Sequence, residues 1–246
     1  MRAAARGEAA EALVTGARTL RDAVGRLRFA APVAHVYNPL EYAWAAHEIY
    51  LRRYGAGRKR VIFLGMNPGP FGMVQTGIPF GEIAAVRDWL GIGTAIAQPS
   101  QQHPKRMITG FACTRSEVSG RRLWGLFAER FGTAKKFFAD HFVLNYCPLA
   151  FLEASGANRT PNKLPPRGRA KLFQLCDEHL RAVAMTLAPD WIIGVGGFAE
   201  DRACEAIGDG AIKVGRVLHP SPASPAANRG WAAAASAELE RLGIWN

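Results

Sequence analysis

The sequence predicts an α/β protein: a single domain in which helices flank a central four-stranded parallel β-sheet. The first reason is that short apolar runs alternate with segments whose apolar residues recur at helical spacing. The second is a length of 246 residues without an internal repeat, which suits one sizeable core. The third is a hydrophobic content of 49% with 21% charged residues, the composition of an ordinary globular protein.

Helices are expected where apolar residues recur at helical spacing. The first spans 8–27, packed on the domain or frayed from it, so 1–30 is expected to be an N-terminal helical extension and 31–246 the main domain. A second helix begins at Asn38-Pro39, with Asn38 as its N-cap, and continues to Gly55. Later helices are expected at 123–131, 170–187, 198–207 and from Ala226 onward. We expect no second hydrophobic core.

The strands are expected at four apolar runs: 61–64, 141–144, 191–195 and 214–218. Runs that are apolar throughout fit parallel strands buried on both faces. The prolines and glycines of Gly65–Met73 end the first strand in a rigid, irregular turn. Residues 98–120 form a long basic loop, either a disordered excursion or a binding surface, and 154–169 form a second basic loop.

The charge of the chain indicates an anionic partner. The formal net charge is +11 and the pI is near 10.0, which favours nucleic acid or an acidic membrane surface. No apolar run approaches the length of a membrane span, and we expect no membrane binding. Without a signal-peptide core, the expected location is cytoplasmic and nucleoid-associated. The cysteines form no Cys-x-x-Cys pair, so we expect reduced thiols and no metal: Cys113, Cys147, Cys176 and Cys204.

Polar side chains follow three of the expected strands: Asn67, Asn145 and His219. Because the carboxyl ends of parallel strands share one edge of the sheet, these side chains can meet in one crevice. Each alone is more often a turn former or structural residue, but their coincidence favours a site. Two amides and an imidazole form no strong nucleophile. They can orient a water, read the edge of a pyrimidine and stabilise negative charge on a leaving group.

Two neighbouring features are compatible with nucleic acid. Phe80 follows Ile78-Pro79 in a fixed loop and is either a base-stacking ring or a core phenylalanine. The segment from His219 to Gly230 is a stiff, proline-rich connection. Its hydroxyl groups on Ser221 and Ser224, and the amides at the following helix start, suit phosphate contacts. A plain strand-to-helix connection is the alternative.

Several ordered motifs over about residues 35–243 resemble the single-strand-selective monofunctional uracil-DNA glycosylases, within the uracil-DNA glycosylase superfamily. The matching stretches are Tyr37-Asn38-Pro39-Leu40-Glu41-Tyr42-Ala43-Trp44, Gly65-Met66-Asn67-Pro68-Gly69-Pro70-Phe71-Gly72-Met73, Gln75-Thr76-Gly77-Ile78-Pro79-Phe80-Gly81-Glu82, Ser116-Glu117-Val118-Ser119-Gly120, Asn145-Tyr146-Cys147-Pro148-Leu149 and His219-Pro220-Ser221-Pro222. The resemblance implies a glycosylase fold for 31–246 and hydrolysis of the N-glycosidic bond of uracil in DNA, leaving an abasic site. It implies no cofactor.

The resemblance also implies roles for individual residues. Asn67 positions the attacking water, and His219 stabilises the departing uracil anion at O2. Asn145 reads uracil, and Phe80 stacks on it. Substrate pocket residues are Met66, through its backbone N–H, and Gly69 and Met73, which leave space near C5 for groups such as 5-hydroxymethyl. The DNA-binding residues expected in the loop are Pro220, Ser221, Ser224, Asn228 and Arg229. The expected partner is single- or double-stranded DNA containing uracil, bound by a monomer.

One position departs from the family pattern. Ala223 stands where an arginine that helps to penetrate the duplex is usual, so activity on stable duplexes is expected to be reduced unless Asn228 or Arg229 compensates. Two other interpretations remain open from the residues themselves. One is a Rossmann-like nucleotide-binding protein that uses Gly194-Val195-Gly196-Gly197, although it lacks the full Gly-x-Gly-x-x-Gly pattern. The other is a non-catalytic nucleic-acid-binding module, favoured only by charge.

Overall fold

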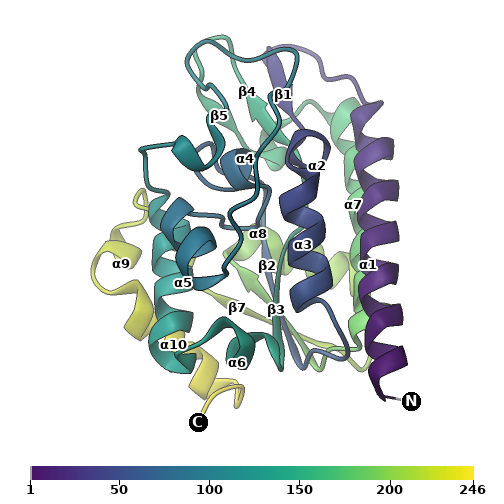
Figure 1. The fold of residues 1–246 in the computed structure, drawn as a ribbon, viewed down its shortest axis with the longest axis vertical. Coiled ribbons are helices and arrows are strands. Elements are labelled where there is room, and N and C mark those ends of the chain that lie inside the picture. The colour runs from purple at the N-terminus through teal and green to yellow at the C-terminus, as the bar shows by residue number, and fades with distance from the viewer. Residues whose placement is uncertain (1) are drawn as a thin grey trace.

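A four-stranded parallel sheet lies between two layers of helices in the computed structural model, which describes residues 2–246 (Figure 1). Its strands pair in the order β3 (His141–Asn145), β2 (Val61–Gly65), β6 (Trp191–Val195) and β7 (Lys213–Val217). The predicted α/β fold and all four predicted strands are confirmed, with ends that differ by at most one residue. The apolar runs form strands because helices cover both faces of the sheet, so side chains on either face are buried.

The helices of the described chain are α1 (Arg2–Gly25), α2 (Pro39–Tyr42), α3 (Trp44–Tyr54), α4 (Met73–Thr76), α5 (Val118–Phe131), α6 (Ala134–Phe138), α7 (Pro166–Leu187), α8 (Gly197–Ile207), α9 (Pro225–Asn228) and α10 (Trp231–Arg241). A π-helical turn spans Ala85–Trp89, and 3-10 turns span Gly110–Ala112 and Pro161–Lys163. No helix within residues 2–246 has the length and apolar character needed to cross a membrane.

Alternating residues of the strands show which helices cover each face. Gly194 of β6 lies against α8, where an added Cβ would overlap the backbone of Glu200. Gly215 of β7 lies on the opposite face, where an added Cβ would lie 3.0 Å from Leu242 after α10. The ring of Phe63 in β2 lies 4.9 Å from that of Phe127 in α5. Thus α5, α6 and α10 cover one face, and α8 with α7 covers the other.

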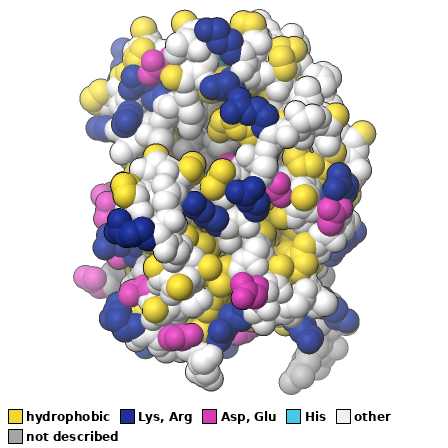
Figure 2. All heavy atoms as spheres, turned by 90° about the vertical axis from the view of Figure 1, so that its left-hand side faces the viewer, with side chains coloured by type: hydrophobic (Ala, Val, Ile, Leu, Met, Phe, Trp, Pro, Cys, Tyr) yellow, Lys and Arg dark blue, Asp and Glu magenta, His cyan; other side chains and the backbone are white. Residues whose placement is uncertain are grey.

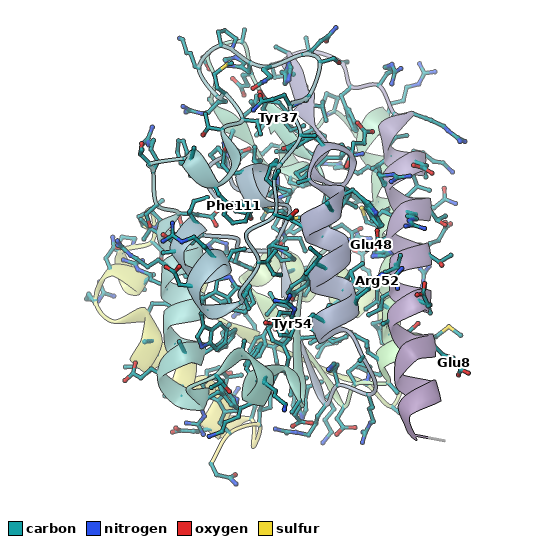
Figure 3. The ribbon with its side chains drawn as sticks, in the orientation of Figure 1. Glu8, Tyr37, Glu48, Arg52, Tyr54 and Phe111 are labelled. Atoms are coloured by element: carbon teal, nitrogen blue, oxygen red, sulfur yellow. The ribbon has the colours of Figure 1, made fainter. Side chains whose placement is uncertain are left out.

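Helix α1 packs along α3 and α7 (Figure 1). Its buried stripe comprises Ala10, Leu13, Val14, Ala17, Leu20 and Val24. At the seam, Arg52 of α3 forms an ion pair with Glu48, at 2.7 Å (Figure 3), and a second one with Glu11 of α1. Ion pairs exposed to this degree contribute only about 0.2–1 kcal/mol each. Burial of the apolar stripe is therefore the main force that holds α1 on the domain.

Around Asn38 the structure differs from the expected single helix with Asn38 as its N-cap. Its side chain makes no capping hydrogen bond; the amide nitrogen donates to Arg21 O, at 3.1 Å, and to Glu41 Oε1, at 3.0 Å. The expected single helix is broken at Ala43 into α2 and α3. The expected last helix is likewise divided into α9 and α10, because Gly230 adopts a φ of 136° between them.

A second, antiparallel sheet was not expected from the sequence. It pairs β1 (His35–Tyr37), β4 (Ala150–Leu152) and β5 (Asn158–Arg159) in that order. A small hydrophobic cluster beneath it is separate from the main core and contains Tyr37, Val74, Ile108, Ala150 and Leu152. The expectation of no second core was therefore wrong, because strands of two or three residues carry almost no periodic signal.

The long basic loop over 98–117 is anchored to this small sheet and to α4. The Tyr37 hydroxyl donates to Arg106 O and accepts from His103 N–H, both at 2.8 Å. Gln75 uses its whole amide: Nε2 donates to Pro70 O and Met107 O, and Oε1 accepts from Thr109 and Gly110 N–H. Of the two alternatives for this loop, a disordered excursion is thereby rejected. The loop forms a wall beside the Gly65–Met73 turn.

Candidate active site

The carboxyl ends of β2 and β3 lie side by side, and Gly65 pairs with Asn145 in the sheet register. The amide of Asn145 and the ring of Phe80 both close on Gly65. A Cβ added there would overlap Asn145 Oδ1 and lie 2.6 Å from Phe80 Cε2. The Phe80 ring in turn lies 6.5 Å from the imidazole of His219, which follows β7. Three of the predicted site residues therefore surround the end of β2.

This crowding makes Gly65→Ala a sensitive test of the site. The added methyl group must displace both the Asn145 amide and the Phe80 ring, since both occupy the space it needs. A displacement of about 1 Å at a catalytic site can cost about a hundredfold in rate. We expect kcat to fall by about that factor while DNA affinity changes little. Single-turnover kinetics and a binding titration check this, and unchanged kcat would show that the two side chains do not meet substrate.

The Gly65–Met73 turn holds Asn67 with its amide in one orientation. Nδ2 donates to Leu149 O, at 3.1 Å. Because a carbonyl can only accept, the nitrogen must face Leu149 and the oxygen must face away. Within the described residues, Asn67 Oδ1 accepts no hydrogen bond, and the backbone N–H groups of Met66 and Gly69 donate none. The turn thus presents one fixed acceptor and backbone donors.

Phe80 is held in a strained conformation. Its φ is 52°, in the left-handed region that a phenylalanine seldom adopts, at a cost of about 1–3 kcal/mol. The carbonyl of Phe80 accepts from Trp124 Nε1, at 3.0 Å, and from Glu82 N–H, at 2.7 Å. Thr76 Oγ1 donates to Gly81 O, at 3.1 Å. These bonds fix the backbone, so the ring is a rigid platform at the pocket.

Asn145 is buried at the end of β3, yet its amide is only weakly engaged. Nδ2 donates to Met73 Sδ, at 3.2 Å. A thioether sulfur is a weak acceptor, and Asn145 Oδ1 accepts no hydrogen bond from the described residues. A buried amide with its donor and acceptor available favours a ligand that supplies one complementary acceptor and one donor. Met73, predicted to line the pocket, lies beside Asn145 in the structure.

His219 is half-buried, and its tautomer follows from one contact. Nδ1 accepts from Ser221 N–H, at 3.1 Å, so Nδ1 carries no proton and the ring proton lies on Nε2. Burial lowers the pKa of His219 below its ordinary value. The side chain is thus a neutral imidazole at neutral pH, with an N–H that donates from Nε2.

The loop after His219 is cross-linked internally. Arg122 of α5 donates to Pro220 O, at 3.0 Å, and to Asn228 Oδ1, at 2.9 Å. Asn228 Nδ2 donates to Pro222 O, at 2.8 Å, so its amide holds the loop. Ser221 Oγ accepts from Ala223 N–H, and Ser224 Oγ caps α9 by accepting from Ala227 N–H. Both hydroxyl hydrogens remain to donate, while Ala223 and Arg229 are exposed.

The opposite wall carries an aromatic and basic cluster that sequence reasoning missed. The Arg115 guanidinium lies 4.0 Å from the centre of the Phe71 ring, and that of Arg106 lies 5.6 Å from it. Figure 2, which looks onto the side that carries α5 and α9, shows Lys and Arg side chains around a hollow. Such a surface suits a polyanion. In the sequence, the basic residues of 98–120 indicated a binding surface, but nothing indicated that Phe71 lies among them.

The glycines at the end of β6 and directly after it serve packing. Gly194 lies against α8, and a Cβ added at Gly196 would lie 3.1 Å from that of His219. Gly196, Gly197 and His219 line a cavity of about 670 Å³ together with Arg216, Glu200 and Arg241. The cysteines are unpaired, and among residues 2–246 no group of three His, Cys, Asp or Glu side chains is arranged to hold a metal ion.

Comparison with known proteins decides the family. The model of the Uracil DNA glycosylase superfamily matches residues 52–240. The single-strand selective monofunctional uracil-DNA glycosylase of Rattus norvegicus is 48% identical over 227 residues, which span 92% of this chain and 82% of that protein. This chain belongs to that glycosylase family. The corresponding proteins of Bos taurus and Mus musculus are also 48% identical, over 92% of this chain and 84% and 81% of theirs.

A solved structure shares this fold at much lower sequence identity. The crystal structure of the wild-type SMUG2 protein of Pedobacter heparinus superposes with a TM-score of 0.65 at 18% identity. The match covers 93% of this chain and 97% of that one. The predicted resemblance is thus confirmed. Neither a dinucleotide-binding protein nor a binding module without catalysis is retained.

Proposed function

We propose that this glycosylase hydrolyses the N-glycosidic bond of uracil after flipping the nucleotide out of its stack, with Asn67 and His219 as the catalytic residues. The observation that carries the proposal is the pair of fixed polar atoms at the end of the sheet: an acceptor, Asn67 Oδ1, and a neutral donor, His219 Nε2–H. A base inside a duplex cannot reach atoms at that depth. Flipping costs about a few kcal/mol and is least costly in single strands.

The flipped base is held by the buried residues around Gly65. The Phe80 ring stacks on its face, and the Asn145 amide pairs with the adjacent N–H and carbonyl of uracil. Cytosine carries an amino group and an unprotonated ring nitrogen at the same edge, so it mismatches the amide orientation. The Met66 N–H supplies a further donor. Because Met73 is flexible, small groups at C5, such as hydroxymethyl, fit as well. The space beside Gly69, which was expected to admit such groups, is filled by the carboxyl group of Glu117.

The chemistry separates charge between sugar and base. Cleavage of the C–N bond leaves positive character on the sugar and negative charge on uracil. The His219 Nε2–H donates to the developing anion, as donors of an oxyanion hole do. Asn67 Oδ1 accepts from a water and directs its oxygen to the sugar carbon. The water gives its hydroxyl to that carbon and its proton leaves to solvent, and the uracil anion takes up a proton on release. No cofactor takes part.

The DNA strand runs between the two walls of the hollow. The hydroxyl groups of Ser221 and Ser224, with Arg229, contact phosphates on the side of the His219 loop. Pro220 stiffens that loop, and Asn228 supports it from within. Phe71 with its two arginines offers a stacking and charged surface on the other side, as single-strand binding proteins use.

One gel tests the activity. The purified protein is incubated with single-stranded oligonucleotides that carry one uracil, thymine or cytosine, and abasic sites are cleaved with alkali. The uracil strand should be cut and the other two should not. An intact uracil strand would reject the proposed activity, and a cut cytosine strand would reject Asn145 as the residue that selects the base.

The exposed Ala223 predicts a preference among DNA structures. With only a methyl group at the loop tip, nothing large enters the gap left by the flipped base in a duplex. We expect single-stranded uracil to be cleaved at least about tenfold faster than uracil paired with adenine, since unpairing costs about a few kcal/mol. Ala223→Arg should raise the duplex rate and leave the single-strand rate unchanged. Equal rates on both substrates for the natural chain would contradict this.

A further inference from the structure

Glu117 has a buried carboxyl group beside the turn that holds Asn67. It is the N-cap residue of α5, and its backbone carbonyl accepts from Arg121 N–H, at 2.9 Å. Its side chain makes no capping hydrogen bond. The carboxyl group lies instead against the Gly65–Met73 turn. This residue belongs to a motif of the sequence, Ser116–Gly120, to which the proposed function gives no role.

The carboxyl group fills the space that side chains at two glycines would need. A Cβ added at Gly69 would overlap Glu117 Oε1, and one added at Gly72 would overlap Oε2. Gly72 has a φ of −116° with a ψ of −109°, outside the regions that residues with a side chain favour, so both its conformation and the space around it demand glycine. Gly69 is not among the glycines with positive φ, and there the demand comes from the space that Glu117 fills.

Glu117 also contacts the part of α5 that supports Phe80. A Cβ added at Gly120 would lie 3.0 Å from Glu117 Oε2 and would overlap Phe80 O. One turn later, Trp124 donates its Nε1–H to that same carbonyl. The carboxyl group thus lies between the turn that carries Asn67 and the backbone of Phe80. These two segments must keep their relative positions around a bound base.

The group is polar without a partner. Glu117 Oε2 is buried and has no hydrogen-bond partner among the described residues. A buried polar atom of this kind costs free energy that an apolar side chain of similar size would not. Filling space alone therefore does not account for a glutamate.

The charges around Glu117 are unfavourable for a carboxylate. The turn from Gly65 to Met73 has no titratable side chain. The Phe80 loop contributes Glu82, whose oxygens accept from Ala85 N–H and Ser116 Oγ, both at 2.9 Å. The preceding loop contributes Arg115, which lies over Phe71. On α5, Arg121 is exposed, and Arg122 bonds the His219 loop, as described above.

We propose that Glu117 is a positioning residue for the glycosylase reaction: its carboxyl group, packed against Gly69 and Gly72, holds the turn of Asn67 in register with Phe80. The proposal rests on the proposed function of that site. Burial, with the nearby charge of Glu82, raises the pKa of Glu117 to about 7. The carboxyl group is therefore neutral below pH 7. Above it, the ionised form is repelled by Glu82 and seeks water, which loosens the turn.

The pH profile is the main test. In the natural chain, kcat on single-stranded uracil DNA should fall at least about fivefold from pH 6 to pH 8.5, with KM nearly constant. Glu117→Gln keeps the shape and cannot ionise, so its kcat should stay within about threefold of the natural value at pH 6 and lose the basic limb. A basic limb that persists in Glu117→Gln would overturn the proposal.

A pair of substitutions tests the packing itself. Gly69→Ala should lower kcat by about a hundredfold, because the methyl group displaces the carboxyl group, which is the one neighbour within contact of that position. In a Glu117→Ala background the same change should cost less than about threefold, since the space is then empty. An equal loss in both backgrounds would contradict the contact. The thermal unfolding midpoint, measured for all four proteins, should show the same coupling.

The two proposals fail in different ways. If the natural chain cleaves no uracil DNA at any pH, the proposed function fails, whereas the coupling of Gly69 and Glu117 in thermal unfolding still reports the packing. If cleavage occurs but Glu117→Gln keeps the basic limb, only the role of Glu117 fails. If Glu117→Ala does not fold, the Glu117→Gln profile still decides.

Discussion

Asn67→Ala should lower the single-turnover rate of uracil release by about two to four orders of magnitude, the range for loss of a positioned acid or base. The alanine removes the acceptor that directs the water and also the bond from Nδ2 to Leu149 O. It leaves the phosphate contacts in place, so the affinity for uncleaved DNA should change less than about threefold. Rapid-quench kinetics and fluorescence anisotropy measure the two quantities.

Asn67→Asp is the matched control for this prediction. It keeps an oxygen toward the water but turns a second oxygen toward the Leu149 carbonyl, which repels it. Its rate should lie between those of alanine and asparagine. If alanine and asparagine release uracil at the same rate, another residue must orient the water, and the free N–H groups of the turn become the next candidates.

His219→Ala should lower kcat by about a hundred- to a thousandfold, the cost of removing one donor from a preorganised anion site. The loss should appear in kcat and not in KM, because the donor meets a charge that exists only once the bond is breaking. His219→Gln, whose amide nitrogen can reach the same region, should recover part of the rate. A loss of less than threefold in His219→Ala would remove this residue from the mechanism.

The state of His219 also predicts an acid limb. Burial lowers its pKa, so the imidazole stays neutral through the neutral range and protonates only as the pH falls below 6.5. Protonation puts a hydrogen on Nδ1 and breaks the bond from Ser221 N–H. On the acid side, activity should therefore decline only as the pH falls through the lowered pKa of His219, apart from the basic limb that Glu117 produces. In His219→Gln this decline should be absent.

The central sheet could be predicted because β2, β3 and β6 are buried along almost their whole length, a pattern that does not depend on distant contacts. The edge strand β7 exposes Lys213 and Arg216. The strand-end residues followed from topology: parallel strands bring Asn145 beside Gly65 wherever the chain goes in between. The small antiparallel sheet could not be predicted, because its strands are too short for any period to appear. Its place is set by the pairing of β1 with β4, which are far apart in the sequence.

The sequence did not reveal the roles of residues whose contacts are distant in the chain. Asn228 suggested a DNA contact, but its amide bonds Arg122, 106 residues earlier in the chain. Gln75 is polar next to a glycine-rich turn and gave no sign of its four bonds to backbone atoms. Glu117 sits in a recognised motif, yet its meaning depends on the space above Gly69 and Gly72. Such pairings exist only in the folded chain.

Release of uracil by hydrolysis is tested most directly by product analysis on a single-stranded uracil oligonucleotide with borohydride present. We expect free uracil and an abasic strand in equal amounts, and no protein–DNA adduct, because water rather than a lysine attacks the sugar. An intact base, or a borohydride-trapped adduct that forms at the rate of uracil release, would contradict it.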